Sequence, residues 1–141
     1  MVYTTNNAEE TEAVGYKLAK KLNEKGIKRL FIAMRGEMGV GKTAFTRGFA
    51  SYFGISGVKS PTYTIVNEYK SETTLFHFDM YRISDEDDLY SAGYDDYFMR
   101  NGIFAVEWSE NVPFAIPENH YKVTIEKLDA DTRKITIEKN L

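Results

Sequence analysis

The chain has 141 residues, 43% hydrophobic and 28% charged, with a formal net charge of −3 at pH 7, which is typical of one globular domain spanning residues 1–141. Disulfides and thiolate metal sites are excluded because cysteine is absent, and no apolar run is long enough to span a bilayer. The sequence lacks a secretion leader and a block of basic residues, so we expect a cytoplasmic protein without its own nucleic-acid-binding surface.

The first predicted element is a helix over about residues 9–25. Val14, Leu18 and Leu22 recur at four-residue spacing in this segment and indicate one apolar face. Residues 30–34 follow as a short apolar strand of the kind that is buried on both faces of a parallel sheet. The carboxyl end of such a strand is where open α/β sheets bind their ligands.

A glycine-rich segment joins that strand to a second predicted helix, over about residues 42–53. Its sequence, Gly-Glu-Met-Gly-Val-Gly-Lys-Thr, matches the G-x-x-x-x-G-K-[ST] pattern of a phosphate-binding loop. In such loops backbone N–H groups and the helix N-terminus bind phosphate, the lysine contacts the β- and γ-phosphates, and the threonine hydroxyl ligates Mg²⁺. The predicted nucleotide-binding residues are Gly36, Glu37, Met38, Gly39, Val40, Gly41, Lys42 and Thr43.

Three residues with turn-forming and hydroxyl character, Ser60, Pro61 and Thr62, come next in a loop that enters a strand near residue 65. Two interpretations are open. The hydroxyl groups could sense a γ-phosphate or hold Mg²⁺, or the segment is a strand-entry turn in which Pro61 keeps Ser60 out of helical angles.

Two carboxylates follow predicted strands. Residues 75–80 alternate so that His77 and Asp79 share a face, and four apolar residues at 103–106 precede Glu107, as in a Walker B strand. A carboxylate at such a position can ligate Mg²⁺ or order a water molecule, whereas the alternative is an ordinary acid at a strand end. We interpret His77, which lies among aromatic residues, as a hydrogen-bonded core histidine rather than a catalytic base.

The rest of the chain predicts short helices and a hairpin. Ser84 is expected to cap a short helix whose acidic first turn suits the helix dipole. Residues 121–126 and 133–138 alternate on either side of a turn and indicate an antiparallel hairpin. We therefore predict an α/β protein with a three-layer P-loop NTPase fold, a mixed, mostly parallel central sheet and a C-terminal antiparallel hairpin.

Four motifs, GEMGVGKT, SPTYT, HFDMYR and VEW, resemble in order and spacing those of the TsaE (YjeE) family, and the similarity extends from about residue 8 to residue 137. These are small bacterial P-loop ATPases needed for threonylcarbamoyl-adenosine modification of tRNA. The departures, such as Met38 for the usual leucine and Ser109 for proline, remove no charged group from the motifs.

The resemblance implies an ATP- and Mg²⁺-dependent hydrolase with switch-like segments around Ser60 and Asp79. It implies a weak ATPase that acts with the partner proteins TsaB and TsaD and meets tRNA only indirectly, through that complex. The implied catalytic residues are Lys42, Asp79 and Glu107; the implied Mg²⁺ ligands are Thr43, Asp79 and Glu107; and the implied nucleotide contacts outside the glycine loop are Thr11, Thr62, Trp108 and Arg133.

Two other functions fit the phosphate-binding loop alone. A small-molecule P-loop kinase usually has an arginine-rich lid, and the six arginines of this chain are well scattered. A GTPase-like switch would need a guanine-reading motif. The segment from Glu126 to Asp129 resembles one, but Glu126 does not offer the chemistry of the asparagine or threonine found there.

Overall fold

The computed structural model describes residues 1–26, 29–61 and 65–140. No helix among these residues is long and apolar enough to cross a membrane. In chain order the elements are β1 (Val2–Thr5), α1 (Ala8–Glu24), β2 (Leu30–Arg35), α2 (Lys42–Tyr52), β3 (Val66–Tyr69), β4 (Leu75–Asp79), α3 (Glu86–Ser91), α4 (Tyr94–Phe98), β5 (Ile103–Glu107), the 3₁₀ helices η1 (Ser109–Asn111) and η2 (Pro113–Ala115), β6 (His120–Lys127) and β7 (Arg133–Asn140).

The strands form one seven-stranded mixed sheet in the order β1-β7-β6-β2-β5-β4-β3. The central strands β6, β2, β5 and β4 are parallel neighbours, and the outer strands pair antiparallel on both sides. The predicted α/β fold with a mixed sheet and a C-terminal hairpin is confirmed. Parallel pairing is confined to the centre, because β3 pairs antiparallel with β4 at one edge and the hairpin does so at the other. Strand β1, which was not predicted, adds a further antiparallel strand beyond the hairpin.

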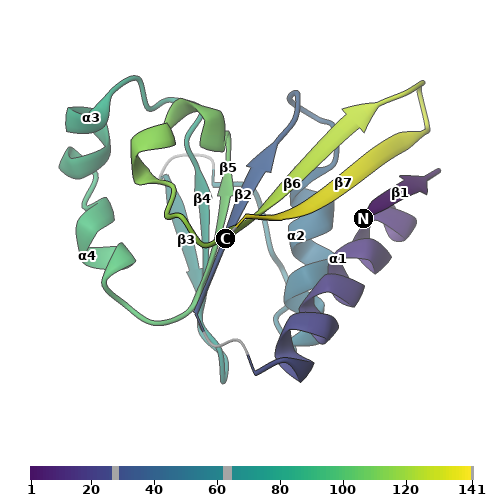
Figure 1. Ribbon diagram of the computed structural model, residues 1–141, viewed down its shortest axis with the longest axis horizontal. Helices are drawn as coiled ribbons and strands as arrows, with labels where there is room; N and C mark the ends of the chain where they lie inside the picture. Colours follow the sequence, from purple (N-terminus) through teal and green to yellow (C-terminus); the bar gives the residue numbers. More distant parts are fainter. Residues whose placement is uncertain (27–28, 62–64, 141) are drawn as a thin grey trace.

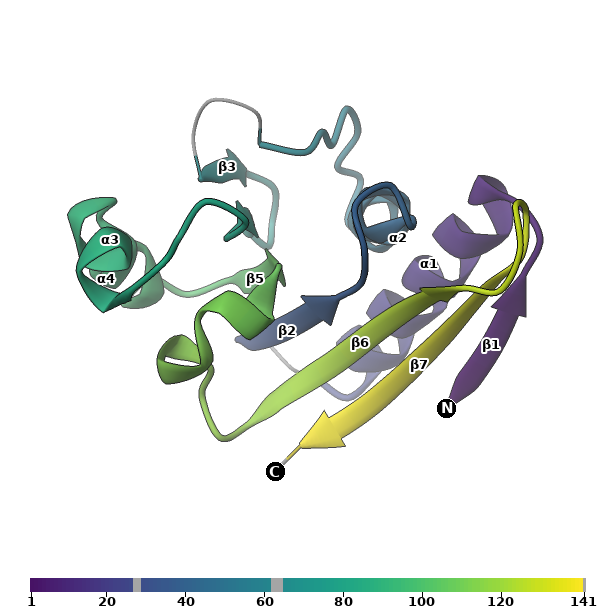
Figure 2. The same cartoon turned by 90° about the horizontal axis from the view of Figure 1, so that it is seen from above.

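Helices cover both faces of the sheet and make three layers (Figure 1, Figure 2). One core lies between the sheet and α1 with α2, and the other lies between the sheet and the segment that contains α3 and α4. Strand β2 contributes to both, since Ile32 and Met34 face the first core while Phe31 and Ala33 face the second. This burial on both faces confirms the prediction made for residues 30–34.

Helices α1 and α2 pack with their backbones in contact. A Cβ added to Gly48 would lie 1.9 Å from the carbonyl oxygen of Glu12, and one added to Gly15 would lie 2.2 Å from that of Phe45. Only glycine fits at these two positions, because the atoms in the way belong to the backbone of the facing helix. The contact fixes α2, and with it the glycine-rich loop that precedes α2.

The predicted N-cap of α3 is wrong by one residue. Asp85 caps the helix by accepting a hydrogen bond from the Asp88 backbone N–H at 2.8 Å, and the hydroxyl of Ser84 instead donates to the Asp88 carboxylate at 2.7 Å. Serine and aspartate are both good N-caps, so residue type alone does not decide which of the two caps α3. Asp88 decides it, because its carboxylate accepts from both the hydroxyl and the backbone N–H of Ser84.

We expect Gly48→Ala to destabilise the protein, because a Cβ at this site meets backbone atoms of Glu12. Overpacking costs about 1–3 kcal/mol, partly offset by the roughly 1 kcal/mol that alanine gains over glycine in a helix. Urea denaturation followed by circular dichroism measures the free energy of unfolding. The exposed control Lys20→Ala should change it by less than about 0.5 kcal/mol, and an equal loss in both variants would contradict the packing argument.

Candidate functional site

The glycine-rich loop lies between the end of β2 and the start of α2. Gly36, Gly39 and Gly41 have φ values of 151°, 75° and 119°, in the region that favours glycine. A Cβ at Gly36 would also lie 2.7 Å from the carbonyl oxygen of Ile125. Gly41 is the N-cap of α2 and offers no side-chain cap, so the first N–H groups of this helix face the loop as potential anion donors.

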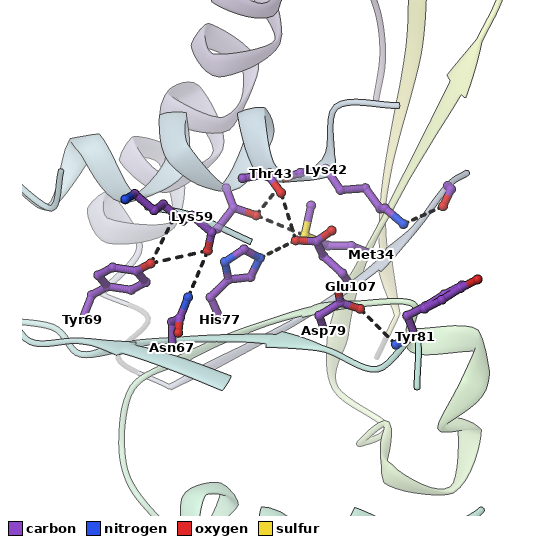
Figure 3. Close-up of polar contacts among 12 residues, drawn as sticks. Met34, Lys42, Thr43, Lys59, Asn67, Tyr69, His77, Asp79, Tyr81 and Glu107 are labelled. Carbon is purple, nitrogen blue, oxygen red and sulfur yellow. Dashed lines mark hydrogen bonds and ion pairs between the residues drawn. The ribbon is translucent and has the colours of Figure 1, made fainter. Parts of the chain in front are cut away.

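The Lys42 side chain folds back over this loop. Its Nζ donates a hydrogen bond to a backbone carbonyl oxygen of the loop (Figure 3), that of Gly36, at 2.6 Å. The same Nζ lies 4.2 Å from the centre of the Trp108 ring. Burial lowers the pKa of Lys42, and the carboxylates of Glu107, Glu110 and Asp79 act in the opposite direction. A partly desolvated cation is therefore held at the loop, where a phosphate group would strengthen its charged form.

The two predicted carboxylates are neighbours at the carboxyl ends of parallel strands. Asp79 of β4 and Glu107 of β5 are opposite each other in the sheet register. Glu107 is buried, and its Oε2 accepts hydrogen bonds from the Thr43 hydroxyl at 3.3 Å and from His77 Nε2 at 2.5 Å (Figure 3). The fold thus brings the three predicted Mg²⁺ ligands, Thr43, Asp79 and Glu107, to one place.

Asp79 is less enclosed than Glu107. One of its oxygens, Oδ1, accepts a hydrogen bond from the Tyr81 backbone N–H at 2.9 Å. Burial raises the pKa of Asp79 and the nearby Glu107 raises it further, while the Tyr81 N–H, Lys42 and His77 oppose this rise. Such a carboxylate, partly desolvated and facing a cavity, can accept a hydrogen bond from water or bind a cation.

These groups line a cavity of about 380 Å³, called here the phosphate-side cavity. Its lining residues are Met38, Gly39, Gly41, Lys42, Thr43, Ala44, Ser60, Asp79, Glu107 and Trp108. A second cavity, of about 360 Å³, lies beside the hairpin turn and is called the hairpin-side cavity. It is lined by Asn6, Asn7, Ala8, Thr11, Gly39, Val40, Gly41, Ala44, Ala130, Asp131 and Arg133. The two cavities share Gly39, Gly41 and Ala44, so they adjoin along the glycine-rich loop.

Arg133 connects the hairpin to the glycine-rich loop. Its Nε donates to the carbonyl oxygen of Val40 at 3.0 Å, and one terminal nitrogen donates to that of Asp129 at 3.0 Å. These hydrogen bonds hold the Arg133 side chain between the hairpin turn and the glycine-rich loop. Thr11 is buried, lines the hairpin-side cavity and shares a hydrogen bond with the Thr5 hydroxyl at 2.9 Å. Its hydroxyl group is therefore already paired within the protein.

Trp108 has an unusual backbone. Its φ of 56° is the only positive value at a non-glycine residue in the described part of the chain, and it occurs where β5 turns into η1. The indole ring packs against Tyr81, with 5.1 Å between ring centres, and lies over Lys42. Strained residues of this kind cluster at functional sites, because the surrounding structure must hold them in place.

Some predicted residues lie apart from the two cavities. Gly36 supports the loop through its contact with Lys42, and Glu37, which is exposed, accepts a hydrogen bond from the Val40 backbone N–H. Thr62 lies outside the described residues. Asn6, Asn7 and Asp131, which also line the hairpin-side cavity, were not predicted; the only signal for them in the sequence is the helix-capping character of Asn7.

The oxygen groups around Glu107 fit a hard cation that arrives with phosphate. The described residues contain no group of three or more histidine, cysteine, aspartate or glutamate side chains that could hold a metal by themselves. One hydroxyl and two carboxylates, from Thr43, Asp79 and Glu107, are what Mg²⁺ uses when phosphate oxygens and water complete its shell.

Comparison with known proteins identifies a family and several similar chains. The family described as "Threonylcarbamoyl adenosine biosynthesis protein TsaE" matches residues 5–135. The chain is 37% identical over 136 residues to the tRNA threonylcarbamoyladenosine biosynthesis protein TsaE of Bacillus subtilis, covering 95% of this chain and 82% of that protein. It is 40% identical over 112 residues to the protein of the same name from Haemophilus influenzae, covering 78% and 70%.

A solved structure agrees with these matches. The crystal structure of YdiB from Bacillus subtilis superposes with a TM-score of 0.78 at 30% sequence identity, and the match covers 99% of this chain and 84% of that one. The similarity therefore includes the sheet, the glycine-rich loop and the hairpin.

We expect Asp79→Asn to stabilise the fold at neutral pH. The folded-state pKa of Asp79 is raised by burial, so its negative charge is less favourable in the folded than in the unfolded chain. This penalty is absent below the ordinary aspartate pKa of about 4, grows as the pH rises through it, and is complete above the raised pKa.

Thermal melts of wild type and Asp79→Asn at about pH 3 and about pH 7 test this, since the variant should melt higher only at the upper pH. The exposed control Asp131→Asn should show no such pH-dependent gain. Equal melting temperatures of wild type and Asp79→Asn at neutral pH would contradict the assigned desolvation.

Proposed function

Because this chain belongs to the TsaE family, we propose that it acts in tRNA threonylcarbamoyladenosine biosynthesis as a Mg²⁺-dependent ATPase. The names of the relatives supply the pathway. The observation that carries the ATPase activity is the convergence of Lys42, Thr43, Asp79 and Glu107 on one cavity at the N-terminus of α2. The protein works with TsaD and TsaB, as the resemblance of its motifs implies, and meets tRNA only through them.

The glycine-rich loop and the start of α2 would bind the triphosphate. Their backbone N–H groups would donate to phosphate oxygens, and Lys42 would exchange its contact with the Gly36 carbonyl for the β- and γ-phosphates. That exchange moves Nζ only locally, because the glycine carbonyl it leaves belongs to the same loop. Burial removes part of the hydration of the Lys42 ammonium group and so lowers its pKa. A bound phosphate would compensate for this lost hydration, which favours the exchange.

Thr43 and Glu107 would hold Mg²⁺, and Asp79 would complete its shell or hold a water molecule bound to it. When bound, Mg²⁺ supplies positive charge to the β- and γ-phosphate oxygens. The free face of Asp79 toward the cavity would also let this carboxylate orient the attacking water. Hydrolysis would then release ADP and phosphate without a second substrate.

The hairpin-side cavity would receive the nucleoside. It adjoins the phosphate-side cavity along Gly39 and Gly41, which is where the α-phosphate would lie. Thr11 and Arg133 form part of its wall and would contact the base side of ATP. Since the Nε of Arg133 already donates to Val40, its contact with a base would come from the flat face or the outer nitrogens of the guanidinium.

We expect Lys42→Ala to weaken ATP binding by about 10-fold to 100-fold, because a hydrogen bond to a charged group contributes about 1.5–3 kcal/mol. Titration with ATP, followed by the fluorescence of Trp108, the only tryptophan, measures the affinity. The control Lys70→Ala removes a lysine whose side chain is 78% exposed and should bind ATP as wild type does. Unchanged affinity in Lys42→Ala would exclude the proposed phosphate site.

Glu107→Gln should retain ATP binding more than turnover. The amide keeps the shape of the side chain but loses the charge that a metal ligand needs, so we expect hydrolysis to fall by about 100-fold or more. Phosphate release measured with TsaD and TsaB present gives the rate. Undiminished hydrolysis would remove Glu107 from the proposed mechanism.

Three further measurements separate the alternatives. ADP and free phosphate as the sole products would contradict a small-molecule kinase. Displacement of bound ATP by GTP at equal concentration would support a GTPase-like switch. Pull-down of TsaD and TsaB with and without ATP tests the partners, and failure to recover either protein in both states would overturn the proposed complex.

A further inference from the structure

His77 makes a contact that the proposed chemistry does not yet use. Its side chain is 0% exposed, and its ring lies on the same face of the sheet as Asp79. The residue opposite His77 on β5 is Ala105, whose methyl group leaves room for the imidazole to reach across to Glu107, two residues further along. Figure 3 shows the ring directed at the Glu107 carboxylate.

The hydrogen bond assigns the proton on the His77 ring. Nε2 lies 2.5 Å from Glu107 Oε2, and we place the hydrogen of this contact on Nε2, since an ionised carboxylate can only accept. In that tautomer Nδ1 bears only a lone pair, and it is buried without a hydrogen-bond partner in the described part of the chain. The ring is thus oriented by one donor aimed at one acceptor.

The same carboxylate oxygen also accepts from the Thr43 hydroxyl at 3.3 Å. Glu107 also lines the phosphate-side cavity. The two donors hold Oε2 and so fix the orientation of the carboxylate toward the cavity. Metal-binding side chains are commonly fixed by such supporting hydrogen bonds, whose loss typically weakens metal affinity by about 10-fold to 100-fold.

We propose that His77 is a positioning residue that holds the Glu107 carboxylate, through Nε2–H donation, in the orientation that receives Mg²⁺ with the nucleotide. This inference rests on the proposed function, because it deepens the role of Glu107. The positioning role depends on a hydrogen-bond donor at the place of Nε2, whereas a purely structural role would depend on how the whole ring packs.

Two amide substitutions separate these roles. His77→Gln places an amide N–H₂ near the position of Nε2, whereas His77→Asn places it near Nδ1, out of reach of Glu107. The free Mg²⁺ concentration that gives half of the Trp108 fluorescence change with ADP is the measured quantity. We expect His77→Asn to raise it by about 10-fold to 100-fold and His77→Gln to recover most of that loss, with ADP affinity in excess EDTA unchanged in both.

A second measurement needs no variant. The chain has two histidines, and His120 Nδ1 lies 2.7 Å from the carbonyl oxygen of Pro117, so His120 carries its hydrogen on Nδ1. Long-range ¹H–¹⁵N spectra should therefore assign opposite tautomers to His77 and His120. Adding Mg²⁺ to the ADP-bound protein should shift the His77 signals and leave those of His120 in place.

The outcomes are distinct. Equal Mg²⁺ responses in the folded asparagine and glutamine variants would overturn the positioning role, and so would an Nδ1–H tautomer of His77 in the wild type. Should His77→Asn fail to fold, the wild-type spectra decide alone. A wild-type protein that binds ADP with no response to Mg²⁺ would instead overturn the proposed metal-dependent function, and the inference with it.

Discussion

The parallel register of β2, β5 and β4 is the constraint on which the site depends. Met34, just before the glycine-rich loop, lies opposite Glu107, and Glu107 lies opposite Asp79. Parallel strands end at the same edge of a sheet, so this register places a loop and two carboxylates at one edge although they are far apart in sequence. A shift of β4 by one residue would turn His77 and Asp79 toward the opposite core.

In the protein without a ligand, the charged groups at this edge of the sheet are unfavourably placed. Burial lowers the pKa of Lys42 and raises that of Asp79, so both groups are held where their charged forms lose hydration. A triphosphate and a divalent cation would each supply the missing opposite charge. Binding sites often carry such instability, which is compensated by packing elsewhere, here by the contact of α1 with α2 at Gly15 and Gly48.

The hairpin has a role in the site as well as in the sheet. Arg133, at the start of β7, fixes the carbonyl group of Val40 in the glycine-rich loop and so joins segments 93 residues apart. The turn before β7 forms part of the hairpin-side cavity. The cavity therefore exists only when the hairpin, the loop and the N-terminus of α1 are packed together, which links nucleotide binding to the integrity of the whole sheet.

Local patterns in the sequence determined the elements and the chemistry they carry. The glycine loop, the alternation around His77 and the apolar run before Glu107 depend on neighbouring residues, and they predicted the α/β fold. They also made Thr43, Asp79 and Glu107 separate candidates, which the family resemblance grouped as one ligand set. Strand β1 escaped prediction because its four residues, of which only Thr5 is buried, give no clear period, and its pairing with β7 is made across the whole chain. The hydrogen bond from His77 to Glu107 and the link from Arg133 to Val40 were decided by tertiary structure alone. The first depends on the strand register that places the small Ala105 opposite His77, and the second on a loop carbonyl group that faces β7. Residue spacing in the sequence indicates neither.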